Sequence, residues 1–447
     1  MPAKFKLKSI TQRTSIGTQA YTGFGFQPTG VFGFGNNRTA DGSHTDAVLA
    51  AGASDGAGRD IFIIAPDNVS PSNVAWKRFS RLWNISTVTL TDLVQADIQS
   101  FDPDGFTLLF QSADAIVRLF MVLAFSGVNF DVGTFQAPAS PGPVSVSTLT
   151  FAPSYVLFLS SGLTTAAPSD SANGDSPGFI GFSAGPGKDR CCHWRIRDNR
   201  TPSDSARVWF NDACIAYMGT PNEGATTPGV KAVMQALKSN GFTVNFSATL
   251  GTHHFAWVAI GGETYAKVGT LQQPSGIGVQ AITGLGFKPG ALILVSANTN
   301  NASGVNTSKA SISLGAASGP TERACCWFGD DGQSPSVADS DLDQTKVIKL
   351  IEPNSLVVNG AADLASFDSD GFTLNWTATD GVARHVSYIV LATQSAPAAL
   401  QHPSQSAKQI KKTRRLRYRP TPTKSTALNR TNNAGDVVNT LIIDPEA

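Results

Sequence analysis

Four landmarks recur three times in the same order along the chain of 447 residues, and this repetition constrains the fold more than any other feature. An aromatic-x-Pro step opens an apolar run at 26–28, 151–153 and 287–289. The pattern Asp-[Asn/Gly]-x-[Ser/Thr]-Pro-Ser spans Asp67 to Ser72, Asp198 to Ser203 and Asp331 to Ser336. An Asn/Asp-Gly turn leads into Phe-Thr-Val/Leu at Gly105, Gly241 and Gly371. An apolar run closes each copy at 120–127, 255–262 and 388–394.

These landmarks predict strands and turns. The opening and closing runs are short, apolar and bounded, as buried strands are, and Pro at the entry needs no ladder donor. The run after each turn alternates apolar and polar residues, which is typical of a half-buried strand. We expect Gly105, Gly241 and Gly371 to take positive φ in their turns. The sequence therefore predicts an all-β protein with three tandem β-sandwich domains of one repeated fold.

The spacing of the landmarks sets the predicted boundaries, because each unit has the size of an independent domain. They are an N-terminal arm plus first domain at 1–127, a linker plus second domain at 128–262, a linker plus third domain at 263–394, and a basic C-terminal arm at 395–447.

Four segments need a closer interpretation. The stretches 128–147 and 263–280 are predicted to be linkers or added strands, since the first is rich in Pro, Ser and Gly. Residues 230–240 have the best helical pattern, and the basic residues 1–13 are predicted to form a second arm.

Composition supports this organisation and excludes some classes of protein. Charged residues make up only 15% of the chain, while Gly (42) and Pro (25) are abundant, which favours strands joined by tight turns. The five Cys form no CxxC pattern and no even set, which favours a reduced environment. No apolar run is long enough for a membrane helix, so we expect no membrane insertion, and residues 1–10 lack the apolar core of a signal peptide.

Positive charge is concentrated near the C-terminus. Ten Lys and Arg and no acidic residue lie between 384 and 435, whereas the preceding part has 24 basic against 30 acidic residues. The segment is also rich in Pro, Ser and Thr, and it ends in short apolar pieces suited to pairing with another subunit's sheet edge. We favour an assembly arm, with a solvated tail and a nucleic-acid grip as weaker alternatives. Its candidate residues are Lys408, Lys411, Lys412, Arg414, Arg415, Arg417, Tyr418, Arg419, Leu441, Ile442 and Ile443.

Two repeated patterns resemble metal sites, and the repeats themselves argue against that interpretation. Asp-x-Asp-Gly at 102–105 and 368–371 is like the start of a calcium loop, but the second copy has Lys238-Ser-Asn240-Gly241 there. Cys191-Cys192 and Cys325-Cys326 match a position that holds Ile61 and Phe62 in the first copy. We therefore expect turns and core positions, and no metal or other cofactor.

The Asp-x-x-[Ser/Thr]-Pro-Ser loop is the most specific internal motif. Asp side chains accept hydrogen bonds from backbone amides two residues on, and Pro fixes the bend that follows. This favours a structural loop at Asp67, Ser72, Asp198, Ser203, Asp331 and Ser336, with a polar site for a sugar or a neighbouring subunit as the alternative.

No catalytic constellation is evident. His253-His254 is the only His pair, and the matching positions of the other copies differ. A G-x-S-x-G elbow, a Walker A loop, GxGxxG and HExxH are absent, and the glycine-aromatic runs at 23–26 and 31–35 are followed by no helical pattern. We therefore expect no enzymatic activity.

Taken together, the opening step, the Cys/Trp-rich insertion, the DSDGFTLNW turn and the YIVLA closure resemble modules of tail and other virion proteins of tailed bacteriophages. The likeness covers the three copies and is weakest in the first, where RDIFIIAP replaces the Cys/Trp insertion. It implies a structural virion protein made in the host cytoplasm, with further copies of itself and neighbouring virion proteins as partners. A tail component (sheath, appendage or fibre subunit) is its most specific form.

Two alternatives stay open at this point. One is a capsid decoration protein. The other is a host-glycan-binding module that would use exposed Trp side chains, with Trp194, Trp209 and Trp327 as candidates and Trp76 and Trp83 behind them.

Overall fold

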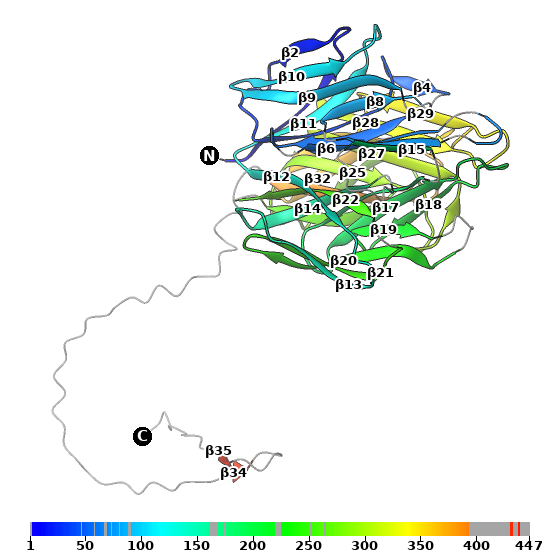
Figure 1. Cartoon of the computed structure of the whole chain (residues 1–447). Coiled ribbons are helices and arrows are strands. Elements are labelled where there is room, and N and C mark those ends of the chain that lie inside the picture. Colours follow the sequence, from blue (N-terminus) through cyan, green and yellow to red (C-terminus); the bar gives the residue numbers. More distant parts are fainter. Residues whose placement is uncertain are drawn as a thin grey trace, which may run out of the picture. The chain divides into compact units, whose positions relative to one another are not determined.

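The computed structural model (Figure 1) describes residues 2–392, except 46, 58, 67–68, 73, 80, 88–90, 161, 163–168, 174–175, 220–224, 251–252 and 263–264, together with 430–431 and 437–438. Every helix or strand among these residues is a β-strand, so the all-β prediction is confirmed. The described part of the chain also holds no helix long and apolar enough to cross a bilayer.

Among the described residues, each repeat has eleven strands in the same order. The first repeat contributes β1 (Lys4–Thr11), β2 (Gly17–Tyr21), β3 (Gly30–Gly35), β4 (Gly42–His44), β5 (Leu49–Ser54), β6 (Arg59–Pro66), β7 (Val74–Phe79), β8 (Trp83–Ser86), β9 (Asp92–Asp102), β10 (Gly105–Ser112) and β11 (Leu119–Ser126). The second contributes β12 (Asn129–Gln136), β13 (Gly142–Val146), β14 (Pro153–Ser160), β15 (Ser169–Asn173), β16 (Ser176–Ser183), β17 (Asp189–Ile196), β18 (Ala206–Phe210), β19 (Ile215–Met218), β20 (Pro228–Lys238), β21 (Gly241–Ala248) and β22 (His254–Gly261). The third contributes β23 (Ala266–Gln272), β24 (Gly278–Ile282), β25 (Pro289–Ser296), β26 (Thr307–Ser308), β27 (Ala310–Gly319), β28 (Glu322–Asp330), β29 (Ala338–Asp343), β30 (Ile348–Ile351), β31 (Val358–Asp368), β32 (Gly371–Thr379) and β33 (His385–Ala392).

Each repeat builds one large and one small antiparallel sheet. The large sheets have the orders β1-β11-β3-β5-β6-β7-β15, β12-β22-β14-β16-β17-β18-β26 and β23-β33-β25-β27-β28-β29-β4. The small sheets have the orders β2-β10-β9-β8, β13-β21-β20-β19 and β24-β32-β31-β30.

The last strand of every large sheet comes from another repeat. β15 of the second repeat pairs with β7 of the first, and β26 of the third pairs with β18 of the second. The cycle closes where β4 of the first repeat pairs with β29 of the third. The fourth strand of each repeat therefore completes the sheet of the preceding one.

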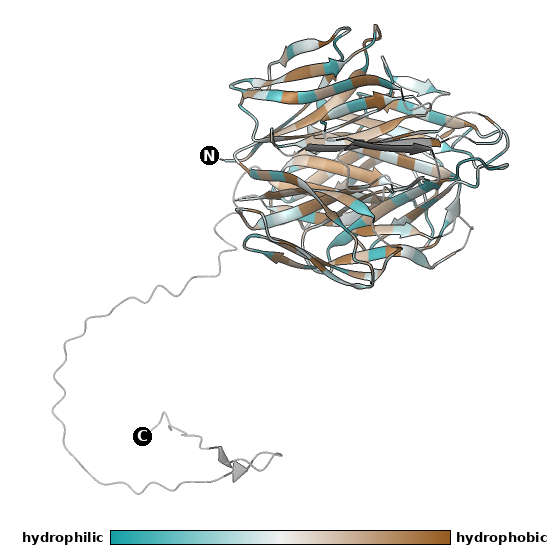
Figure 2. Cartoon of the chain, viewed as in Figure 1, coloured by the Kyte–Doolittle hydropathy of each residue, from teal (hydrophilic) through white to brown (hydrophobic). Residues whose placement is uncertain are grey.

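The large sheets are buried on both faces. Along β3, Val31 faces a core shared with the small sheet of its own repeat, whereas Phe32 and Phe34 face a core that contains residues of all three repeats. The same alternation separates Val156 from Leu157 in β14. Strands buried on both faces are apolar throughout, which explains the unbroken opening and closing runs (brown in Figure 2).

Aromatic rings of different repeats meet in this shared core. Trp194 on β17 is fully buried; its ring centroid lies 5.5 Å from that of Phe62 in the first repeat and 6.3 Å from that of Phe328 in the third. Phe125 and Phe130, on either side of the first junction, lie 5.2 Å apart. The repeats are thus joined by packing, and residues Met1–Leu400 form one compact unit.

Two sequence predictions are wrong. Residues 1–13 form no arm, since β1 pairs along its whole length with β11 and buries Phe5 and Leu7 while its lysines point outward. Residues 230–240 form no helix but lie mostly in β20, where Val230, Ala232 and Met234 enter the core at a period of two. In both segments the alternation of buried side chains prevails over local residue preference.

The junction segments were predicted to be linkers or added strands, and they contain added strands. β12 and β13 lie within 128–147, and β23 and most of β24 lie within 263–280. Beyond residue 392 the structure describes only β34 (Arg430–Thr431) and β35 (Val437–Val438), which pair with each other in a second unit, Gln401–Ala447.

The shared core predicts that the repeats unfold together. Replacing Trp194 with Ala should destabilise the body by about 3–5 kcal/mol, because the ring contacts both other repeats. Differential scanning calorimetry should show one transition for the parent protein and one, at lower temperature, for the variant. A new early transition that carries about a third of the enthalpy, with the rest unmoved, would show instead that the repeats are independent.

Candidate functional site

The three repeated loops lie together and bind one another through their backbones. The N–H of Ser72 in the first repeat donates to the carbonyl of Arg200 in the second, at 2.9 Å. The N–H of Ser203 donates to the carbonyl of Gln333 in the third, at 3.1 Å, and that of Ser336 returns to the carbonyl of Val69, at 3.2 Å. The sixth residue of each motif thus donates to the third residue of the next, which makes a closed ring, here called the loop ring.

Side chains add a second set of bonds to the loop ring. The hydroxyl of Ser72 donates to the carbonyl of Arg197, at 2.7 Å, and Asp198 accepts the N–H of Val74, at 2.7 Å. The hydroxyls of Ser70 and Ser334 lie 2.9 Å apart. The Ser/Thr–Pro bond is cis in all three copies. Asp67 lies outside the described residues.

Between the second and third repeats the loop ring contains a buried carboxylate. Asp330, directly before the third motif, accepts hydrogen bonds from the hydroxyls of Ser203 and Ser336, each at 2.9 Å, and from the N–H of Gly332. Burial raises the pKa of Asp330 above its ordinary value of 3.8, although these donors oppose the shift. The neighbouring Asp331 accepts the N–H groups of Gln333 and Val337.

Only a small part of the loop ring is exposed to solvent. The repeated serines Ser72, Ser203 and Ser336 are buried, and only the tips before them are exposed, at 69–71, 199–202 and 333–335. Its polar groups are thus used mainly between repeats.

The repeated turns owe their glycines to a close approach. A Cβ on Gly105, Gly241 or Gly371 would lie within about 2 Å of the carbonyl oxygen of Tyr21, Val146 or Ile282 on the neighbouring edge strand. Gly105 and Gly241 also take positive φ, but Gly371 does not, so that part of the prediction is wrong for the third copy. In all three copies the turn can accept no side chain.

The carboxylates of the Asp-x-Asp-Gly turns serve as local hydrogen-bond acceptors. Asp104 accepts the N–H groups of Gly23 and Gly25, and these bonds lower its pKa. Asp370 accepts those of Gly284 and Gly286 in the same way. In the second copy the Asn240 amide donates to the carbonyl of Ser147, which explains how this turn forms without the carboxylate. Within the described residues no cluster of His, Cys, Asp and Glu could hold a metal ion.

The cysteines and histidines singled out by the sequence are also packed inside. All five Cys are buried and free, and Cys191 and Cys192 point into two different cores. Burial lowers the pKa of His253 to about 4, and its ring packs edge-on against Tyr217 at 5.0 Å. The imidazole of His253 is therefore neutral at pH 7, in an aromatic setting.

The tryptophans that suggested a glycan platform are not on the surface. Trp83, Trp194 and Trp327 are essentially inaccessible, and Trp209 is 6% exposed. The indole of Trp209 stacks on His385 of the third repeat, with ring centroids 3.8 Å apart, and donates to the hydroxyl of Ser387. These Trp residues hold sheets and repeats together; the side chain of Trp76 lies outside the described residues.

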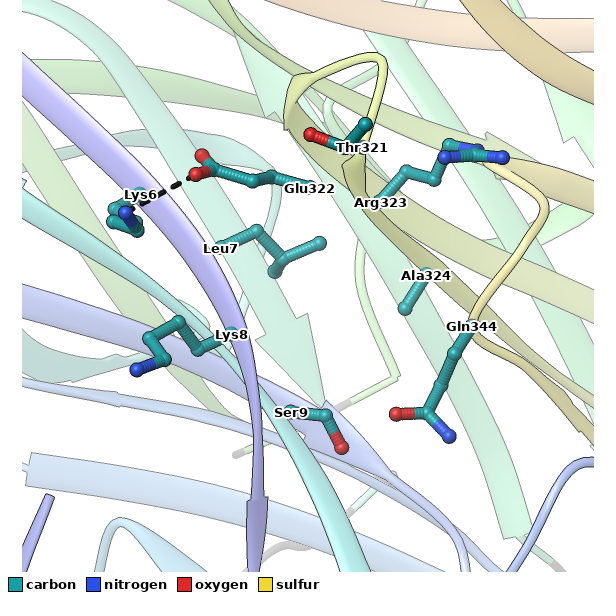
Figure 3. Close-up of a pocket in the computed structure, with 9 residues that line it drawn as sticks. All are labelled: Lys6, Leu7, Lys8, Ser9, Thr321, Glu322, Arg323, Ala324 and Gln344. Carbon is teal, nitrogen blue, oxygen red and sulfur yellow. Dashed lines mark ion pairs between the residues drawn. The ribbon is translucent and has the colours of Figure 1, made fainter. Parts of the chain in front are cut away.

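Hollows open where β1 meets the β27–β28 hairpin of the third repeat. One, of about 290 Å³, is lined by Lys6, Lys8, Glu322 and Arg323 among others (Figure 3). An adjoining groove of about 550 Å³ adds Phe24, Phe26 and Lys288 to Lys6 and Glu322.

The charges in these hollows are largely paired. Lys6 forms an ion pair with Glu322 at 3.1 Å, and Arg323 forms one with Asp363. Lys8 donates to the carbonyl of Thr22. The Ser318 hydroxyl also donates to Glu322, at 2.6 Å. The hollows are therefore a polar seam between the first and third repeats.

Sequence reasoning found the motif of the loop ring but missed its partners. Ser203 and Asp330 are 127 positions apart, and nothing local indicates such a pairing. The available signal was that all three copies have a Ser at the sixth position; the structure shows that all three are buried. The candidate arm residues Lys408, Lys411, Lys412, Arg414, Arg415, Arg417, Tyr418, Arg419, Leu441, Ile442 and Ile443 lie outside the described residues.

No protein-family model and no curated protein matches the sequence.

The loop ring predicts unequal effects for two serine substitutions. Ser203→Ala removes a donor from the buried Asp330 carboxylate and should cost about 1–3 kcal/mol of unfolding free energy. Ser334→Ala removes an exposed hydroxyl that contacts Ser70 and should cost less than about 0.5 kcal/mol. Urea denaturation of the full chain compares them, and equal losses would contradict the assigned roles.

Asp330 predicts a pH dependence of stability. Because its pKa is raised in the folded state, the stability linked to its protonation is fully present below about pH 3.8 and is lost as pH rises through the raised value. The Asp330→Asn variant has no ionisable group at this position, so its stability does not decrease for this reason as pH rises. The melting temperature of the parent, measured relative to the variant, should therefore fall as pH rises from about 4 towards 8. If the melting temperatures of the two proteins differed by the same amount at every pH, this prediction would be contradicted.

Proposed function

We propose that the chain is a non-enzymatic structural protein of the virion of a tailed bacteriophage, and specifically a tail component that assembles with further copies of itself. The observation that carries the proposal is the closed connection of the three repeats by strand exchange and the loop ring. Such a body resists separation of its parts, which a load-bearing subunit requires. The resemblance of the repeated landmarks to virion modules of tailed bacteriophages is the reason for proposing a virion protein in particular.

The positions of the chemically interesting residues support the same proposal. The Cys pairs lie in cores, the Asp-x-Asp-Gly carboxylates bond their own turns, and the motif serines join repeats. Each of these groups has a structural task. The alternative of a host-glycan site is poorly supported, because its candidate residues Trp83, Trp194, Trp209 and Trp327 are buried.

Labelling of intact particles tests this function. Gold-labelled antibodies raised against the body of the protein should decorate the tails of purified virions in electron micrographs. Label confined to the head would favour the capsid decoration alternative, and its absence from particles would contradict a virion role. Particles incubated with pre-immune serum provide the control.

A further inference from the structure

Each small sheet ends in an outermost strand with an outward-facing edge. The three repeats differ in whether a residue blocks that edge. β2, β13 and β24 occupy equivalent edges. Thr18, Pro143 and Val279 are equivalent within them, since they lie opposite Leu109, Asn245 and Asn375 of the adjacent strands. An unpaired edge can accept a further strand, so proteins commonly block it with charged residues or Pro.

The first and second repeats block this edge. In the first, the guanidinium of Arg13 donates to the carbonyl of Thr18, so the backbone at this position faces away from β10. In the second, Pro143 holds the equivalent place and has no N–H to offer. A proline is tolerated within an edge strand where its nitrogen faces outward, which agrees with the direction of the Thr18 carbonyl.

The third repeat leaves the same edge open. Pro274 stands where Arg13 stands in the first repeat, because Gln12 and Gln273 before them make equivalent backbone bonds to Arg118 and Arg384. Pro274 cannot make the bond to Val279 that Arg13 makes to Thr18. Among the described residues, no backbone hydrogen bond from outside the sheet reaches β24.

The open edge is also apolar and uncharged. The side chain of Val279 is 76% exposed and that of Ile277, just before β24, is 72% exposed. Gly278–Ile282 contains no Lys, Arg, Asp or Glu. Ile16 is similarly exposed in the first repeat, so the distinguishing features of the third are Val279 and the missing block.

We propose that β24 pairs antiparallel with β24 of a second copy of this chain, joining two small sheets into one of eight strands. An uncharged strand does not repel itself, and antiparallel pairing brings Val279 and Ile277 of each copy against apolar side chains of the other. Because this edge is blocked in the other two repeats, the contact closes at two copies. One strand pair buries little area, so the dimer is weak and depends on concentration. This deepens the self-assembly part of the proposed function and rests on it.

Sedimentation velocity over a concentration series tests the pairing, with Val279→Pro as the probe. This change gives the third repeat the residue that the second already has, so the sheet should tolerate it, and circular dichroism checks the fold. The dissociation constant should rise at least about tenfold. Thr18→Pro at the blocked edge is the matched control and should leave it unchanged. Val279→Lys serves the same test with a charge in place of the proline.

A parent protein that stays monomeric up to about millimolar concentration would overturn the pairing, and so would a dimer that neither Val279 variant weakens. Labelling of virions is a separate readout. Tail label with a monomeric protein would therefore refute the strand pairing alone, whereas a Val279-sensitive dimer without label on particles would refute the virion role.

Discussion

The large sheets have no face that can be left to solvent. Each packs one face on its own small sheet and turns the other, with residues such as Phe34, Leu157 and Ile293, towards the core that all three repeats share. Burying such a side chain is worth about 1.5–3 kcal/mol, and the shared core contains many of them. A repeat on its own would expose this face, so its stability depends on the other two.

Strand exchange and the loop ring follow the same cyclic order and reinforce that dependence. Each large sheet ends in a strand of the next repeat, which covers an edge that would otherwise be free. The loop ring then satisfies backbone groups between neighbours, with Ser203 and the buried Asp330 as its most enclosed contact. Separating one repeat would break packing, two exchanged strand pairs and buried hydrogen bonds at once. The proposed structural role relies on this mechanical unity.

Much of the fold could be predicted because its signals are local. The apolar runs, the glycine turns and the equal spacing of the landmarks define strands and repeats. The sequence did not show that neighbouring repeats bury the second face, since a strand buried within its own domain has the same composition. The exchanged strands are short and lie in the variable insertions; β26 is only Thr307–Ser308. The lysines of β1 favoured the wrong prediction of an arm, and the helix-forming residues of β20 favoured the wrong prediction of a helix.

The central claim is that three repeats form one body that does not depend on the chain connections between them. Protease sites inserted at the junctions, after Gly127 and after Gly262, allow both connections to be cut in the folded protein. Size-exclusion chromatography with light scattering should then show the three fragments eluting together at the mass of the uncut protein, and separating only in denaturant. Fragments that separate under native conditions would contradict the account.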